Sequence, residues 1–157
     1  MENIDRIIHH PLFRSSMTKI RECEEKRKFC CHGIEHSLDV ARMAYINNLE
    51  QALGFSKDMI YAAALLHDIG RWKQYADNTP HEEAGAAIAA VILEVTSFNE
   101  GERQQILDAI GNHREKQAEV FSKLLYQADK QSRVCWLCEA QEACYWPDEK
   151  KNRTIRD

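Results

Sequence analysis

The sequence predicts an all-α protein, a compact bundle of about six helices followed by a short cysteine-rich tail. Apolar residues recur at spacings of three and four along almost every segment, which is typical of amphipathic helices. Only three prolines interrupt the 157 residues, and no stretch alternates long enough to predict a strand. The chain is long enough to bury one core. We therefore expect a helical domain over residues 1–133 and a cysteine-rich extension packed on it over residues 134–157.

Three helices are expected in the first half of the chain. The first covers residues 16–28 and is charged and amphipathic. The second runs over about residues 35–53, where Gly54 is a natural C-terminal stop. The third begins after Ser56, a favourable N-cap residue, and ends at Gly70.

Three more helices are expected in the second half. The stretch TPHE at 79–82 reads as a capping box with proline at the first helical position, and the helix continues to about residue 95. Asn99 with Glu102 predicts the start of the fifth helix, which ends near His113. The sixth covers about residues 118–133. Each of these helices contributes residues with chemically active side chains.

Composition and charge exclude some classes of partner. The formal net charge is −4 and the pI is about 6.0, so no basic field favours a nucleic acid polymer. The chain has no run of 18 apolar residues, and its N-terminus lacks the apolar region of a secretory signal. We expect a cytoplasmic protein with no membrane partner. The sequence does not indicate an oligomeric state.

Histidine and aspartate residues occur near the ends or breaks of most expected helices. They are His36, the pair His67 and Asp68, His81, His113 and Asp129. Imidazole nitrogens and carboxylate oxygens are ligands for divalent transition metals. A bound cation would also offset the cost of burying Asp68 in the apolar stretch AAALLHDIGRW. Each of these residues alone is more often a surface or core residue, but the set in this order predicts a metal site. His9 and His10 lack this context and are expected on the surface.

The order H…HD…H…H…D resembles the HD domain superfamily of metal-dependent phosphohydrolases over about residues 30–133. EHSLDVARMA at 35–44 is similar to the first-histidine helix of that family, and AALLHDIGRW at 63–72 to its defining helix. The resemblance implies an HD-domain-like bundle with a primary metal site formed by His36, His67, Asp68 and Asp129. It also implies a second ion at His81 and His113, with Asp68 bridging. The ions would be iron, manganese, cobalt, nickel or zinc.

The resemblance implies hydrolysis of a phosphoester of a small molecule, a nucleotide or a phosphorylated metabolite, by metal-activated water. Asp68 would be central to this catalysis. A phosphate also needs cations from the protein, and arginine suits it because the planar guanidinium donates two parallel hydrogen bonds. The candidates are Arg71, Arg114, Lys130 and Arg133, with Arg71 and Lys130 first because they lie close in sequence to metal ligands. Each could equally be a solvated surface residue.

Two further sets of residues lie on or just before the first-histidine helix. His32, four residues before His36, could contact substrate or act as a general acid, and a capping or surface role is equally consistent. Asp39 and Arg42 have the three-residue spacing of a helical ion pair, so we expect a structural role for them.

Two other functions remain open. Some proteins that resemble this ligand set hold two irons and oxidise their substrate with dioxygen. A third hypothesis is a non-catalytic protein in which the metal is structural and a nucleotide or partner is bound. Phosphate release without oxygen consumption separates hydrolysis from oxidation, and turnover of any phosphoester excludes the non-catalytic hypothesis.

The tail VCWLCEAQEACYWPDEKKN at 134–152 carries Cys135, Cys138 and Cys144. A CxxC step is a common zinc-binding element, and the fourth ligand of a tetrahedral site would be Cys31 or Cys30. An iron–sulfur cluster is a less favoured use of the same ligands. The alternative of equal weight is that these cysteines pack as small apolar residues beside Trp136 and Trp146. In a reducing compartment, disulfides are less expected than free thiols or metal ligands.

Overall fold

The computed structural model describes residues 1–112 and 119–155, and within these ranges it contains helices and no strand. The all-α prediction is confirmed. The helices are α1 (Glu2–His9), α2 (Pro11–Glu24), α3 (Ile34–Glu50), α4 (Lys57–Leu66), α5 (Arg71–Asp77), α6 (His81–Leu93), α7 (Glu100–Asn112) and α8 (Val120–Gln131), with 3-10 turns η1 (Cys135–Leu137) and η2 (Asp148–Lys150).

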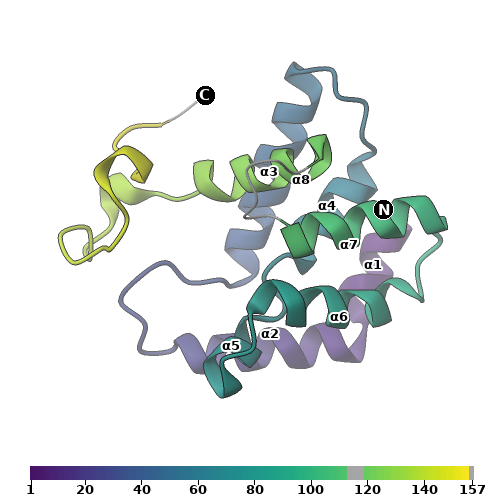
Figure 1. The fold of residues 1–157 in the computed structure, drawn as a ribbon, viewed down its shortest axis with the longest axis horizontal. Coiled ribbons are helices and arrows are strands. Elements are labelled where there is room, and N and C mark those ends of the chain that lie inside the picture. Colours follow the sequence, from purple (N-terminus) through teal and green to yellow (C-terminus); the bar gives the residue numbers. More distant parts are fainter. Residues whose placement is uncertain (113–118, 156–157) are drawn as a thin grey trace.

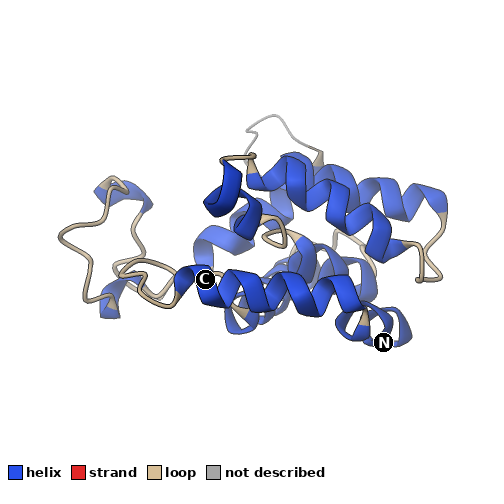
Figure 2. Ribbon diagram, turned by 90° about the horizontal axis from the view of Figure 1, so that it is seen from below, coloured by secondary structure: helices blue, strands red, loops and turns tan. Residues whose placement is uncertain are grey.

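Helix α4 forms the centre of the bundle. Seven of its ten residues are buried, among them the alanines at 62–64, which are completely inaccessible. Their small side chains let neighbouring helices approach closely, and α4 packs against α1, α3, α7 and α8. The other main pairings are α3 with α8 and α6 with α7 (Figure 1). The segment after α8 extends from one end of the bundle in both views (Figures 1 and 2).

The N-terminal region differs from the expectation of one helix over residues 16–28. It forms α1 and α2, and α2 ends at Glu24. The break comes at Pro11, which occupies the first position of α2, while the His10 ring accepts a hydrogen bond from the backbone N–H of Leu12 at 3.2 Å. His10 is therefore a half-buried N-cap, and His9 is exposed as expected.

The expected ends of the second and third helices need correction. Helix α3 stops at Glu50, before a turn in which Gly54 adopts a φ of +81°. Helix α4 starts as predicted, with the Ser56 hydroxyl accepting from the Met59 N–H at 3.2 Å. It ends at Leu66, and residues 67–70 form a turn that leads into the short helix α5, which periodicity did not reveal.

One predicted capping box is confirmed and the other is wrong. The Asn99 N–H donates to Glu102 Oε2 at 2.9 Å, and the Glu102 N–H donates to Asn99 Oδ1 at 3.0 Å, as expected for α7. At α6 the N-cap is Pro80 and no side chain caps the helix. The Thr79 hydroxyl instead donates to Asp77 Oδ1 at 2.6 Å, because the end of α5 places that carboxylate within reach.

We expect Asn99→Ala to lower the free energy of unfolding by about 1 kcal/mol, the usual cost of losing an N-cap side chain. Urea denaturation followed by circular dichroism measures the change. Thr79→Ala is the matched control, since Thr79 caps no helix and should cost less. An equal loss in the two variants would contradict the capping role of Asn99.

Among the described residues, no helix combines the length and the apolar character needed to cross a bilayer.

Candidate metal centre

The ends of four helices bring the predicted ligands to one buried place. His36 is in the first turn of α3, His67 and Asp68 are in the turn after α4, and Asp129 is near the end of α8. His81 is the first residue of α6. All five side chains are buried. Helix ends suit this purpose because side chains there can converge without interrupting the packing of helix faces.

The four predicted ligands of the primary site lie together. His36 Nε2 is 3.1 Å from Asp129 Oδ1 and 3.8 Å from Asp68 Oδ2. His67 Nε2 is 3.0 Å from Asp68 Oδ2 and 3.9 Å from Asp129 Oδ1. His36, His67 and Asp129 each offer a ligand atom, and these three atoms all lie within 4.8 Å of one another. The side chains at positions 36, 67, 68 and 129 therefore converge on one place, as the predicted metal site needs.

The ring nitrogens are oriented for coordination. His67 Nδ1 lies 2.7 Å from the Ala64 carbonyl oxygen, which can only accept, so Nδ1 carries a proton and Nε2 is the nitrogen that faces the carboxylates. His36 Nδ1 lies 3.4 Å from the Ser132 hydroxyl, whose own proton goes to the Asp129 carbonyl at 2.9 Å. Both rings therefore present Nε2 to the centre, held by partners of the kind that orient metal-ligating histidines.

Two buried atoms at this centre show that the residues fit a metal ion. Over the described part of the chain, His36 Nε2 and Asp129 Oδ1 are buried and make no hydrogen bond. Buried polar atoms are normally satisfied, so such a pair needs an explanation. Two imidazoles and two carboxylates match the ligand preferences of divalent transition metals, and a cation would satisfy both atoms.

Asp68 faces two histidines with its two oxygens. Oδ2 is the oxygen near His67, and Oδ1 lies 3.4 Å from His81 Nε2. The Nδ1 of His81 is 2.8 Å from Gln74 Oε1, which helps to fix the ring. Oδ1 also accepts a hydrogen bond from Arg71 Nε at 3.1 Å. A carboxylate placed in this way can bridge two ions. His113 and Arg114, expected as a second-ion ligand and a phosphate contact, lie outside the described residues.

The centre keeps its carboxylates ionised although they are buried. Burial alone would raise the pKa of Asp68, but His67 and Arg71 outweigh it and hold that pKa well below its usual range. Burial likewise opposes ionisation of Asp129, where His36 and Lys130 lower the pKa. Burial lowers the pKa of His36 to about 4, so its ring is neutral and able to coordinate at neutral pH.

A cavity of 330 Å³ lies beside the metal centre and shares Asp129 with it. Its other charged lining residues are all cations, and its remaining wall is largely aromatic. The cations are Arg27, Arg71, Lys130, Arg133 and Lys150, and the aromatic residues are Phe29, Tyr126, Tyr145 and Trp146. Of the candidates for substrate contact, His32, Arg71, Lys130 and Arg133 line this cavity. Sequence reasoning did not assign the remaining lining residues of this cavity to a substrate site, although the basic run KRKF at 26–29 and the tail sequence YWPDEKK at 145–151 supply several of them.

Besides Arg71, which bonds to Asp68, two more of the predicted cations touch the metal centre. Lys130 Nζ is 2.6 Å from Asp129 Oδ2, and Arg133 Nη2 is 3.5 Å from Asp129 Oδ1. Their charges neutralise the carboxylate in the free protein. By contrast, Asp39 and Arg42 form the expected pair at 3.4 Å on an exposed helix surface.

His32 is buried and not a surface residue. Its Nδ1 is 2.5 Å from Glu24 Oε1, and its backbone N–H donates to Glu24 Oε2 at 2.7 Å. The Tyr75 hydroxyl donates to the same carboxylate at 2.6 Å. Burial would raise the pKa of Glu24, but these hydrogen bonds and the His32 ring lower it to about 2. Sequence reasoning missed Glu24, because a glutamate on a charged helix gives no local sign of burial.

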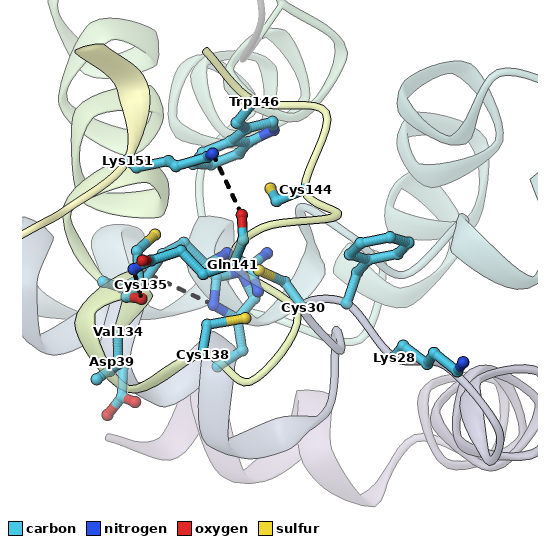
Figure 3. A pocket seen from close by; sticks show the side chains of 14 residues that line it. Lys28, Cys30, Asp39, Val134, Cys135, Cys138, Gln141, Cys144, Trp146 and Lys151 are labelled. Atoms are coloured by element: carbon cyan, nitrogen blue, oxygen red, sulfur yellow. Dashed lines mark hydrogen bonds between the residues drawn. The ribbon is translucent and has the colours of Figure 1, made fainter. Parts of the chain in front are cut away.

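The cysteines of the tail line a second cavity, of 290 Å³, together with Cys30 (Figure 3). Cys31 does not line this cavity, and its thiol is exposed near the Phe29 carbonyl at 3.7 Å. Of the two expected sources of a fourth thiolate, the structure therefore places Cys30 beside Cys135, Cys138 and Cys144.

Comparison with known proteins agrees with these observations. The family model of the HD domain matches residues 33–140. An uncharacterized protein of Clostridium beijerinckii is 43% identical over 155 residues, which cover 99% of each chain. The crystal structure of a predicted HD superfamily hydrolase from an uncultured Thermotogales bacterium superposes with a TM-score of 0.64, over 88% of this chain and 80% of that chain. The identity to that protein is 24%, so the likeness shows a shared fold.

Proposed function

This chain belongs to the HD domain family, and from that membership we propose that it is a metal-dependent phosphohydrolase acting on a small phosphorylated molecule, with a nucleotide as the best-fitting class. The observation that supports this most is the cavity beside the metal centre. It combines cations for a phosphate with aromatic side chains for a base, and it reaches the centre at Asp129.

His36, His67, Asp68 and Asp129 would hold the primary ion, and His81 would hold a second ion at the other oxygen of Asp68. Such ions, when bound, supply positive charge to phosphate oxygens and lower the pKa of water. The histidine and carboxylate donors are compatible with iron, manganese, cobalt, nickel or zinc.

The cavity favours a compact anionic substrate. Five cations face one lining carboxylate, Asp129, so the space has an excess of positive charge although the whole chain is acidic. A volume of 330 Å³ lies in the range of small-molecule sites. Lys130 is 5.2 Å from the centre of the Trp146 ring, which places a cation and an aromatic face side by side. A phosphate and a base could be held together there.

His32 would serve as the proton donor for the leaving group. Burial lowers its pKa, which favours the neutral ring in the free protein, and Nδ1 donates a hydrogen bond to the Glu24 carboxylate. A phosphate in the adjoining cavity would favour the charged form of the ring and raise that pKa. His32 would then take up a proton as substrate binds and release it to the departing oxygen.

The proposal is tested with the purified protein loaded in turn with manganese, iron, cobalt and nickel. Mononucleotides, dinucleotides and sugar phosphates are supplied, and phosphate release and oxygen consumption are measured together. Phosphate release without oxygen consumption supports the proposal. Oxygen consumption that depends on iron would favour the oxygenase hypothesis, and binding of a nucleotide without turnover would favour the non-catalytic one.

We expect Lys150→Ala to raise KM about tenfold with little change in kcat. Lys150 lines the cavity from the tail, and a charge-assisted contact of an exposed residue contributes about 1.5 kcal/mol, near the low end for such bonds. Steady-state kinetics on the best substrate of the panel measures the effect. Lys123→Ala, an exposed lysine on α8 that does not line the cavity, is the matched control. Equal KM values for the two variants would remove Lys150 from the substrate site.

A further inference from the structure

The segment after α8 has almost no hydrophobic core of its own. Apart from the 3-10 turns η1 and η2, residues 134–155 form loops. Its apolar side chains are largely outside: Leu137 is 76% exposed, Tyr145 78% and Ile155 79%. A segment that buries so little apolar surface usually needs a covalent or metal cross-link to hold one conformation.

One attachment of this tail is visible. The Asn152 side-chain amide is buried and donates to the carbonyls of Lys130 at 2.7 Å and Arg133 at 2.8 Å. These bonds tie the far end of the tail to the end of α8. The intervening loop of about residues 136–147 is held to the rest of the tail through Gln141, which bonds to Cys135 at 2.7 Å and to Lys151 at 3.3 Å, and Trp146 lies with its ring 5.2 Å from Lys130 of α8. A cross-link to the loop between α2 and α3 would add a second attachment to the bundle.

The cysteines occupy the place where that second attachment is needed. Cys135, Cys138 and Cys144 come from the tail, and Cys30 comes from the loop between α2 and α3. All four line the same 290 Å³ cavity, and Figure 3 shows their side chains gathered there from the two segments. Burial raises the pKa of the Cys30 thiol, and the three tail thiols are near enough to act in the same direction.

We propose that Cys30, Cys135, Cys138 and Cys144 bind a structural zinc ion that cross-links the tail to the helical bundle. Four thiolates are the ligand set of closed tetrahedral zinc sites, with Zn–S distances of about 2.3 Å. The Cys135–Cys138 step forms a turn in which the Cys138 N–H donates to the Cys135 carbonyl at 3.2 Å, so both thiols belong to one compact element. In the structure no three of these thiols lie within 4.8 Å of one another, so the side chains would have to move inward around the ion.

The surrounding charges suit such a site. Zinc with four thiolates carries two negative charges, and the cavity is also lined by three cations, Lys28, Arg133 and Lys151, against one carboxylate, Asp39. Arg133 donates to the Cys31 carbonyl at 3.0 Å, which holds its guanidinium beside the loop that carries Cys30. Three cations around an anionic centre lower the cost of burying its charge.

The zinc site would also shape the substrate cavity. Cys30 and Cys144 line both cavities. The residues after Cys144 supply Tyr145, Trp146 and Lys150 to the wall of the 330 Å³ substrate cavity. Holding Cys144 against Cys30 therefore fixes one side of the space beside the metal centre. His36 of the metal centre also lines the cavity of the cysteines, and the role of a zinc ion held by the four thiolates would be structural.

The test uses full-length protein carrying Asp68→Ala, so that the histidine centre contributes little metal. An organomercurial reagent that reacts with thiols is added, and the zinc released is measured with a chromogenic chelator. We expect one zinc per chain. Cys138→Ser and Cys144→Ser should abolish the release. Cys31→Ser and Cys23→Ser, which change thiols that do not line the cavity, should leave it intact.

A second measurement uses cobalt as a spectroscopic probe, and a control checks the fold of the serine variants. Protein in which cobalt replaces zinc should show the intense absorption of thiolate-to-cobalt charge transfer, and circular dichroism of the serine variants should retain the helical signal of the bundle. The proposal is overturned if thiol modification releases no zinc, or if Cys31→Ser abolishes release as fully as Cys138→Ser. Iron with acid-labile sulfide, or a disulfide among the four cysteines, would overturn it as well.

Discussion

Asp68→Ala is expected to empty both metal positions and to abolish hydrolysis. Asp68 faces a different histidine with each of its oxygens, with Oδ2 at 3.0 Å from His67 Nε2 and Oδ1 at 3.4 Å from His81 Nε2. Losing an outer-sphere partner of a metal site already costs about 10–100-fold in affinity or activity. Losing a bridging ligand should cost more. Elemental analysis should find a fall from about two transition metals per chain, apart from any zinc bound by thiols.

Two variants separate loss of metal from loss of structure. Asp68→Asn keeps the shape of the side chain and its hydrogen bond from Arg71, but it removes the charge that a bridging ligand needs. It should fold like the unsubstituted protein and still lose metal and activity. Asp108→Ala, an exposed carboxylate on α7, should change neither. Full metal content in both Asp68 variants would show that the ions are held elsewhere.

The convergence of the candidate ligands could be predicted from local sequence signals and from their order along the chain. His67 and Asp68 are polar residues in the apolar stretch AAALLHDIG, and the order of His36, His67, Asp68 and Asp129 along the chain narrows the choice of fold. The helices of the bundle follow from periodicity and from caps such as Ser56 on α4 and Asn99 on α7. The local sequence therefore identifies the residues of the centre, and the packing of the helices brings their side chains together.

The surroundings of the centre could not be predicted because they depend on contacts between distant segments. Glu24 is buried by the loop that carries His32 and by Tyr75, which is 51 residues further along the chain. Lys150 and the aromatic residues of the tail reach the cavity only because the tail turns back on the bundle. Cys30 and Cys31 are adjacent in sequence, and only the path of the loop decides which of them faces the other thiols.

Gly70→Ala should destabilise the fold and disturb the side of the centre that holds His81. A Cβ at position 70 would lie 2.3 Å from the His81 carbonyl oxygen, 2.4 Å from the Gly85 nitrogen and 2.9 Å from the Ala84 carbonyl carbon. These are backbone atoms of α6, so no side-chain rotation relieves the overlap. Helix α6 would have to move away from the turn at 67–70, and His81 would move with it.

The expected loss of unfolding free energy for Gly70→Ala exceeds the ~1–3 kcal/mol typical of overpacked cores, because backbone must shift and not only side chains. Chemical denaturation of the chelator-treated protein measures it without the contribution of bound metal. Gly111→Ala is the matched control: its Cβ meets nothing within 4 Å, and it lies in α7, where alanine is favoured over glycine by about 0.5–1 kcal/mol. If Gly70→Ala were as stable as Gly111→Ala and kept its full metal content, the close approach of α6 to this turn would not be what positions His81 beside Asp68.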